Sequence, residues 1–273
     1  MSYFNYQNKK VYYEVHGEGK PLVILNGIMM STASWKPFVE VFSQQNKLVL
    51  VDFLDQGQSD KLVNETYTQQ LQVDIINALF EHLNLTNVSL MGISYGGEVA
   101  QQFAVQYQSK LERLLLFNTC AYTSPLLGDI GKAWNLAAES KSGEAYYYTT
   151  IPVIYSPAYY ARRLEWMRNR EKILIPVFAN PTFSEAMVRL TKSADTHDVR
   201  KQLAEITIPT LVVSSDQDMI TPMLEQDLMV KGLQNAHHVI LTNTGHASMY
   251  EQPLLFASLV FGFVNVKATD YQI

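Results

Sequence analysis

Residues 92–97 of the chain read GISYGG and directly follow the apolar run VSLM at residues 88–91. Beyond this point, from residue 96 to residue 107, apolar side chains such as Val99 and Phe103 recur at helical spacing. The stretch therefore predicts a buried strand, a tight turn and a helix, with Ser94 at the corner of the turn. Side chains beside this corner would collide with neighbouring elements, which explains the glycines that flank it.

The same alternation of short apolar runs and helical patterns extends along most of the chain and predicts a mostly parallel sheet with helices on both faces. Strands are predicted at residues 11–15, 22–26, 48–52, 88–91, 114–117, 211–214 and 238–241. The first pairs with residues 3–6 as a hairpin that turns at Asn8 and Lys9. Between residues 121 and 200 the alternation breaks into aromatic-rich, helix-like segments. We therefore predict an α/β core of residues 1–120 and 201–273 with an inserted helical cap of residues 121–200.

Composition narrows the class of function. Hydrophobic residues make up 47% and charged residues 17% of the chain, the balance of a globular protein. The net charge of -5 lacks the basic excess that nucleic-acid binding needs. No apolar run approaches the roughly 20 residues of a membrane span, and the N-terminus lacks the pattern of a signal peptide. The single cysteine, Cys120, is interpreted as a packed small residue. We expect a cytoplasmic protein that acts on small molecules without a metal or cofactor.

Ser94 becomes a nucleophile only if a base removes its proton, so a histidine is required. His246 lies in the run NTGHAS at residues 243–248, between a predicted strand and a helix. That position is the carboxyl edge of the sheet, where α/β active sites form. We interpret the remaining histidines as structural or solvent-facing: His16, His82, His197, His237 and His238.

A catalytic histidine also needs an acid that orients the imidazole and stabilises its protonated form. Asp216 and Asp218 both follow the strand predicted at residues 211–214, and their positions leave either as the acid. The helix that begins at Tyr95 directs backbone N–H groups towards negative charge that develops near Ser94.

Together these motifs resemble the α/β-hydrolase superfamily, in particular its small capped serine esterases, lactonases and carbon–carbon hydrolases. The resemblance covers nearly the whole chain apart from the cap. The family carries its acid in a D-x-x-[VT]-P run, which residues 218–222 match, so the resemblance implies Asp218 rather than Asp216. It also implies an oxyanion hole built from the backbone N–H groups of Ile28 and Tyr95. Related dehalogenases and epoxide hydrolases carry Asp at the position of Ser94, which excludes those activities.

Two segments depart from the family pattern. Asn26 replaces the usual histidine before Gly27, a change expected to affect loop support or substrate contacts. Residues 52–60, DFLDQGQSD, lack the arginine and the first glycine of the family's D-x-R-G-x-G-x-S loop. We interpret this segment as a structural turn in which Asp55 is solvated.

The cap supplies the expected substrate pocket and one candidate surface. Its aromatic residues can line an apolar pocket with polar tips, and the candidate pocket residues are Asn26, Trp134, Tyr155 and Tyr159. Residues 162–172 also carry a basic excess, formed by Arg162, Arg163, Arg168, Arg170 and Lys172. Such a segment is usually a solvated helix face, but it could also bind an acidic acyl carrier protein.

The sequence thus predicts a serine hydrolase that cleaves a carboxylic ester of a small to medium, partly apolar substrate through an acyl-enzyme. Its catalytic residues would be Ser94, Asp218 and His246. The same residues also serve thioesterases, hydrolases of carrier-linked acyl esters, lactonases and carbon–carbon hydrolases. Outside enzymes, the fold allows a small-ligand receptor or signalling protein.

Overall fold

The computed structural model describes residues 2–269 and contains an eight-stranded sheet in the order β1-β2-β4-β3-β5-β6-β7-β8. β1 and β2 pair antiparallel and β2 is antiparallel to β4, whereas all further pairs are parallel. The strands are β1 (Ser2–Tyr6), β2 (Lys9–His16), β3 (Lys20–Leu25), β4 (Asn46–Val51), β5 (Val88–Ile93), β6 (Leu111–Phe117), β7 (Thr210–Ser215) and β8 (Ala236–Leu241). The predicted fold class and strands are therefore confirmed.

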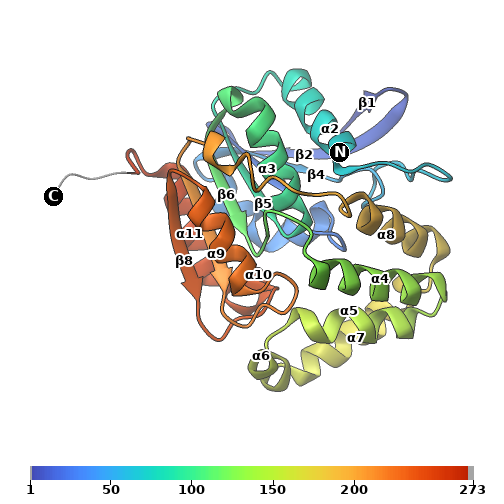
Figure 1. Cartoon of the computed structure of the whole chain (residues 1–273). Coiled ribbons are helices and arrows are strands. Elements are labelled where there is room, and N and C mark those ends of the chain that lie inside the picture. Colours follow the sequence, from blue (N-terminus) through green and yellow to red (C-terminus); the bar gives the residue numbers. More distant parts are fainter. Residues whose placement is uncertain (1, 270–273) are drawn as a thin grey trace.

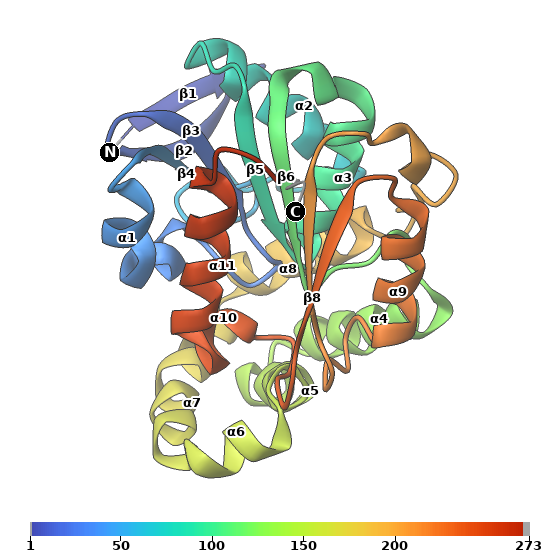
Figure 2. The same ribbon diagram turned by 90° about the vertical axis from the view of Figure 1, so that its left-hand side faces the viewer.

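Helices cover both faces of this sheet, as Figure 2 shows for α1 and α11 on one side and α2 and α3 on the other. The alternation of side chains along the strands explains both layers: Leu22 and Ile24 pack under one, Val23 and Leu25 under the other. The helices of these layers and their connections are η1 (Thr32–Phe38), α1 (Val39–Ser43), α2 (Gln69–His82), α3 (Tyr95–Tyr107), η2 (Gln108–Lys110), η3 (Leu203–Glu205), α9 (Met223–Gly232), α10 (Ser248–Glu251) and α11 (Pro253–Asn265).

Between β6 and β7 the chain forms a run of helices that we call the helical insert: α4 (Pro125–Glu139), α5 (Gly143–Ile154), α6 (Pro157–Arg162), α7 (Leu164–Phe178) and α8 (Pro181–Ser193). In Figure 1 these helices lie beyond the ends of the central strands. Ser124, Ser156 and Asn180 each cap a helix with a side-chain oxygen and precede a proline at its first position. This pairing satisfies an N-terminal donor and removes another, so prolines here begin helices rather than interrupt them.

The N-terminal hairpin turns one residue earlier than predicted. Tyr6 pairs with Lys9, so Gln7 and Asn8 form the turn, and Lys9 already belongs to β2. Gln7 and Asn8 both have positive φ, at 47° and 67°. A two-residue hairpin turn needs this backbone at both positions because its twist must match that of the strands.

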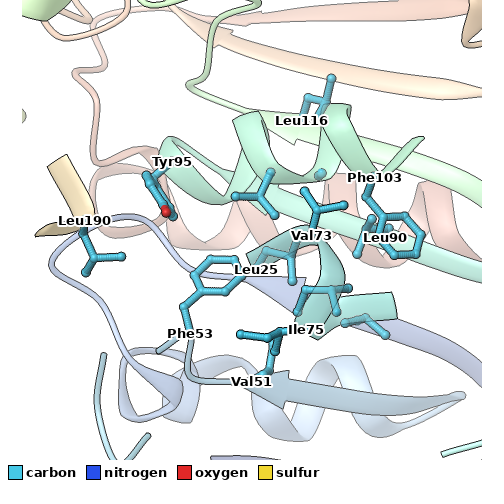
Figure 3. Packing of buried hydrophobic residues seen from close by; sticks show 14 of the residues in the cluster. Leu25, Val51, Phe53, Val73, Ile75, Leu90, Tyr95, Phe103, Leu116 and Leu190 are labelled. Atoms are coloured by element: carbon cyan, nitrogen blue, oxygen red, sulfur yellow. The ribbon is translucent and has the colours of Figure 1, made fainter. Parts of the chain in front are cut away.

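The core also joins the helical insert to the sheet. Phe53 and Tyr95 pack edge to face with ring centroids 5.7 Å apart, and Leu190 of α8 belongs to the same buried cluster (Figure 3). The Tyr95 hydroxyl is hydrogen-bonded to Ser193 of α8, at 2.8 Å. The residue that follows Ser94 is therefore anchored to the insert through its side chain.

Residues 2–269 contain neither a membrane-spanning helix nor a cluster of metal-binding side chains. Within them no helix is both long and apolar enough to cross a membrane. Nor do three or more His, Cys, Asp or Glu side chains of that region gather into a group that could hold a metal ion.

Candidate active site

Ser94 lies between β5 and α3 with a backbone φ of 53°, in the region that non-glycine residues rarely adopt. Its amide donates to the Phe117 carbonyl at 2.9 Å, which holds the turn against β6. A Cβ on Gly92 would meet the Gly96 carbonyl oxygen at 2.2 Å, and one on Gly96 would meet the Leu25 carbonyl oxygen at 2.3 Å. The flanking glycines are therefore required by close backbone contacts, for the reason that the sequence suggested.

His246 faces Ser94 from the loop after β8. Its Nε2 lies 2.9 Å from the Ser94 Oγ, and its Nδ1 lies 2.8 Å and 3.0 Å from the two carboxylate oxygens of Asp218. With Nδ1–H donating to Asp218, Nε2 is left to accept the serine proton. The structure thus brings Ser94, His246 and Asp218 into one hydrogen-bonded chain.

The Asp218 side chain is buried and every hydrogen bond it accepts favours its ionised form. Oδ1 accepts from the amides of Ile220 and Thr221, both at 2.9 Å, and Oδ2 accepts from the Thr221 hydroxyl at 2.9 Å. Burial alone would raise the pKa of Asp218, but the charge of His246 and these bonds hold it below its ordinary value. Asp216, by contrast, is exposed, and its Oδ1 accepts from the Thr244 amide.

Asn118, at the end of β6, is a supporting residue that the sequence reasoning did not identify. Its Nδ2 donates to Asp218 Oδ2 at 3.0 Å and to Ser215 Oγ at 2.9 Å, while its Oδ1 accepts from Ser248 at 2.6 Å. Asn118 is therefore a second orienting group for the acid. The sequence could have indicated this role, because Asn118 directly follows a central strand at the edge of the sheet that carries Ser94.

The loop after β3 lies against Ser94. A Cβ built on Gly27 would lie 3.5 Å from the Ser94 Cβ, and Ile28 lines the cavity beside Ser94. Tyr95 is the first residue of α3, where the backbone N–H has no partner within the helix. Both predicted oxyanion-hole residues thus flank the serine.

Asn26 supports the loop after β3 through hydrogen bonds, and it does not line the cavity beside Ser94. Its side chain is fully buried: Nδ2 donates to the Val51 carbonyl at 2.9 Å, and Oδ1 accepts from Trp35 Nε1 at 2.7 Å. Nδ2 also donates to Gln56, whose own Nε2 donates to the carbonyls of Gly27 and Ile28 at 2.8 Å and 3.0 Å. The replacement of histidine at this position therefore contributes to loop support and not to substrate contact.

A cavity of about 330 Å³ opens above Ser94 and His246, within the range of small-molecule sites. Trp134 and Tyr155, two of the predicted pocket residues, line it, whereas Asn26 and Tyr159 do not. Tyr159 is buried and stacks on Tyr155 instead, with ring centroids 5.6 Å apart. Arg170 also lines the cavity, so its assignment to a solvated basic surface was wrong.

A second, smaller cavity of about 50 Å³ adjoins Ser94 and is lined by Tyr95 and Glu98, among others. Glu98 is buried, and burial raises its pKa to about 8 despite hydrogen bonds from Gln69 and Cys120. The carboxyl group is therefore neutral at neutral pH. Cys120 is also fully buried, as its interpretation as a packed residue expects.

The prediction that Asp55 is solvated is wrong. Asp55 is 1% exposed and receives two bonds from Arg189 of α8, Nη2 to Oδ1 at 2.7 Å and Nε to Oδ2 at 3.0 Å. The amide of Leu62 and the hydroxyl of Tyr67 also donate to it, each at 2.9 Å. The segment of residues 52–60 thus ties the helical insert to the core. Its partner lies 134 positions away, which no local pattern reveals.

Another histidine of the chain, His197, has a structural environment. Its Nε2 lies 3.1 Å from the Cys120 carbonyl and its Nδ1 3.0 Å from Gln102. Burial lowers the pKa of His197 to about 4, so the ring is neutral at neutral pH. Through Gln102, the ring connects the segment after α8 to α3.

A parallel sheet whose strand ends present serine, aspartate and histidine in this chain order defines the α/β-fold hydrolases as the class of protein. Comparison with known proteins gives the family: the model of the alpha/beta hydrolase family matches residues 22–259. The chain therefore belongs to the alpha/beta hydrolase family and is a hydrolase enzyme.

Relatives extend over the full chain. MGS-M2, an alpha/beta hydrolase enzyme from a Medee basin deep-sea metagenome library, is 48% identical over 100% of both chains, with a TM-score of 0.98. The 3-oxoadipate enol-lactonase 1 of Acinetobacter baylyi is 27% identical over 96% of this chain and 95% of its own. The enol-lactonase of Burkholderia xenovorans LB400 shares the fold, with 20% identity over 97% of this chain and 100% of its own and a TM-score of 0.85.

Proposed function

We propose that the protein hydrolyses carboxylic esters of small to medium, partly apolar substrates through an acyl-enzyme on Ser94. The observation that carries the proposal is the 2.9 Å contact between Ser94 Oγ and His246 Nε2, with the opposite ring nitrogen on Asp218. A serine with an oriented imidazole has the arrangement that nucleophilic acyl transfer requires.

In the proposed mechanism, Ser94 Oγ attacks the ester carbonyl carbon while its proton moves to His246 Nε2. The carbonyl oxygen becomes an oxyanion that accepts hydrogen bonds from the backbone N–H groups of Ile28 and Tyr95. Collapse of this intermediate breaks the ester bond, and His246 gives the proton to the departing alcohol. Water, deprotonated by His246, then attacks the acyl carbon. The bond from that carbon to Ser94 Oγ breaks, His246 returns the proton to Ser94 Oγ, and the acid is released.

The helical insert acts as a cap in this proposal, because Trp134, Tyr155 and Leu174 come from it to line the cavity above Ser94. These side chains make the pocket apolar and limit the entry of water. We propose the division into a core of residues 1–120 and 201–273 and a cap of residues 121–200, and the insert's contribution to the cavity wall supports it.

Lactone opening is the second candidate, favoured by the 27% identity to an enol-lactonase over 96% of the chain. It needs the same residues, since a lactone is an ester whose alcohol stays attached to the acyl group. Thioester and carbon–carbon bond hydrolysis would also use this triad.

The test is reaction with a fluorophosphonate probe, followed by peptide mapping, together with turnover of 4-nitrophenyl esters. We expect the label on Ser94, and Ser94→Ala should fold normally yet lose about 10⁴-fold or more in kcat. Ser89→Ala, a buried serine of β5 that is not in the triad, is the control for folding. An unlabelled Ser94 with intact turnover would refute the proposal, and a folded wild type without any turnover would favour a ligand receptor.

A further inference from the structure

Arg170 differs from the other arginines of its segment. Arg162, Arg163 and Arg168 are exposed, and Arg168 forms a 2.7 Å ion pair with Glu171. Arg170 is partly buried instead and lines the same cavity as Ser94 and His246. A single cation therefore reaches the cavity from the middle of α7.

No carboxylate neutralises this cation within the part of the chain that the structure describes. The ion pairs found between residues 2 and 269 do not include Arg170, and its buried Nε has no hydrogen-bond partner there. Glu251, the buried last residue of α10, lies at the beginning of α6 and already has partners: it accepts from the amides of Ser156 and Gly245 at 2.8 Å and 3.1 Å.

Aromatic rings hold the guanidinium in place. Its Cζ lies 4.8 Å from the ring centroid of Trp166, one helical turn earlier on α7, and 5.2 Å from that of Tyr250. A cation over aromatic rings is stabilised by them without donating its N–H groups to a hydrogen-bond acceptor. Tyr250 lies four positions after His246, so the stacked group is fixed relative to the catalytic loop.

An arginine in such surroundings has a specific complement. Polar groups that leave water without a hydrogen-bond partner cost free energy, and a bound anion would remove that cost. The planar edge of a guanidinium matches the two oxygens of a carboxylate, which makes this pair stronger than neutral hydrogen bonds. The rest of the cavity wall is largely aliphatic and aromatic and would contact the hydrocarbon part of the same molecule.

We infer that Arg170 binds a carboxylate of the substrate, so that the preferred ester or lactone carries a free carboxylate at a point separate from its scissile carbonyl. This inference rests on the proposed function for the reaction and adds the substrate class. Half-esters of short aliphatic dicarboxylic acids are the simplest members of that class.

The experiment compares mono-4-nitrophenyl adipate with 4-nitrophenyl hexanoate, which has the same acyl length without the carboxylate, after subtraction of spontaneous hydrolysis. Arg170→Met keeps an unbranched, apolar stem and removes the guanidinium with its charge. Arg168→Met is the matched control, because it removes the same charge from the exposed face of the same helix.

We expect the wild type to prefer the adipate half-ester, and Arg170→Met to lose about tenfold to hundredfold in kcat/KM on it, the range of a charged hydrogen bond. The hexanoate ester should change less than about threefold, and Arg168→Met should leave both substrates unchanged. Equal losses on both esters in Arg170→Met, or a wild type that prefers hexanoate, would overturn the inference.

Binding separates this inference from the chemistry at Ser94. Monomethyl adipate should bind to Ser94→Ala in calorimetry and should bind at least tenfold more weakly to Ser94→Ala/Arg170→Met. Equal affinity in the two proteins would overturn the role of Arg170 even if Ser94 is the nucleophile. Weaker binding in the double variant would support it even if Ser94 is not.

Discussion

Two charged side chains of the site differ in their partners: Asp218 at the carboxyl edge of the sheet has many hydrogen-bond donors, whereas Arg170 in the helical insert has no countercharge among the described residues. At the sheet edge, the Asp218 carboxylate receives hydrogen bonds from His246, Asn118, Thr221 and Ile220. In the insert, Arg170 reaches the same cavity with a buried nitrogen that has no partner among the described residues. The protein therefore preorganises its reactive groups, whereas the charge of Arg170 is left for the substrate to neutralise.

The most severe way to break the sheet edge is to remove the charge of Asp218. We expect Asp218→Asn to lower kcat by about 10³- to 10⁴-fold, since His246 would lose its orientation and the support for its cation. Asp216→Asn should stay within about threefold, because Asp216 is exposed and contacts the Thr244 amide, not His246. Steady-state kinetics on one ester settles the choice, and the reverse order of effects would make Asp216 the acid.

Sequence could predict the sheet edge in detail because its chemistry depends on short local motifs. A serine in a strand–turn–helix corner, a histidine after the last strand and a D-x-x-[VT]-P run each lie within a few residues of a strand end. Strand ends in a parallel sheet meet at one edge, so local positions become a site without knowledge of long-range contacts.

The insert could not be predicted in this way, because its side chains are placed by contacts between distant segments. The local sequence predicted that Asp55 is a solvated turn residue, but in the folded protein it pairs with Arg189 of α8. Arg168 and Arg170 lie in the same basic stretch of sequence. Only the orientation of α7 in the folded protein places Arg170 at the cavity and Arg168 in solvent. Helical spacing shows which residues share a face but does not show what the face meets.

The ion pair between Asp55 and Arg189 joins the core to the helical insert. Asp55→Asn tolerates the φ of 71° at this position yet leaves Arg189 without a countercharge. We expect the free energy of unfolding to fall by about 3 kcal/mol in denaturant melts, the lower end for breaking a buried pair.

Asp129→Asn is the matched control, since it removes the exposed pair of Asp129 with Lys132 and should cost at most about 0.5 kcal/mol. Equal stability of Asp55→Asn and the wild type would show that the pair does not hold the insert to the core.

Glu98 is a buried carboxyl group whose ionisation is opposed by its burial in the core. Burial raises its pKa in the folded state to about 8, above the ordinary value of 4.5. The folded state thus binds more protons than the unfolded chain between these values, and stability is lost as the pH rises through this window.

Glu98→Gln should remove this loss, so its stability relative to the wild type should rise from pH 5 to pH 8 by on the order of 3 kcal/mol. Chemical denaturation at both pH values gives the measurement, and Glu205→Gln, at an exposed acid, should show no such trend. Parallel pH curves for Glu98→Gln and the wild type would mean that Glu98 is ionised in the folded protein.

The smallest expected effect concerns the outer surface of the insert, where we propose an encounter with an acidic acyl carrier protein. With Arg170 in the cavity and Arg168 paired to Glu171, the exposed cations that remain are Lys172 on α7 and, near the junction of α6 and α7, Arg162 and Arg163. Exposed charges act mainly on the rate of encounter, so Arg162→Glu/Arg163→Glu should slow hydrolysis of a carrier-linked acyl substrate several-fold at low salt. The matched reversal Lys201→Glu/Lys231→Glu, at exposed lysines outside the insert, should have a weaker effect, and neither variant should alter turnover of a small ester. Stopped-flow kinetics at two salt concentrations tests this: identical rates for both double variants would leave these arginines as an ordinary solvated helix end.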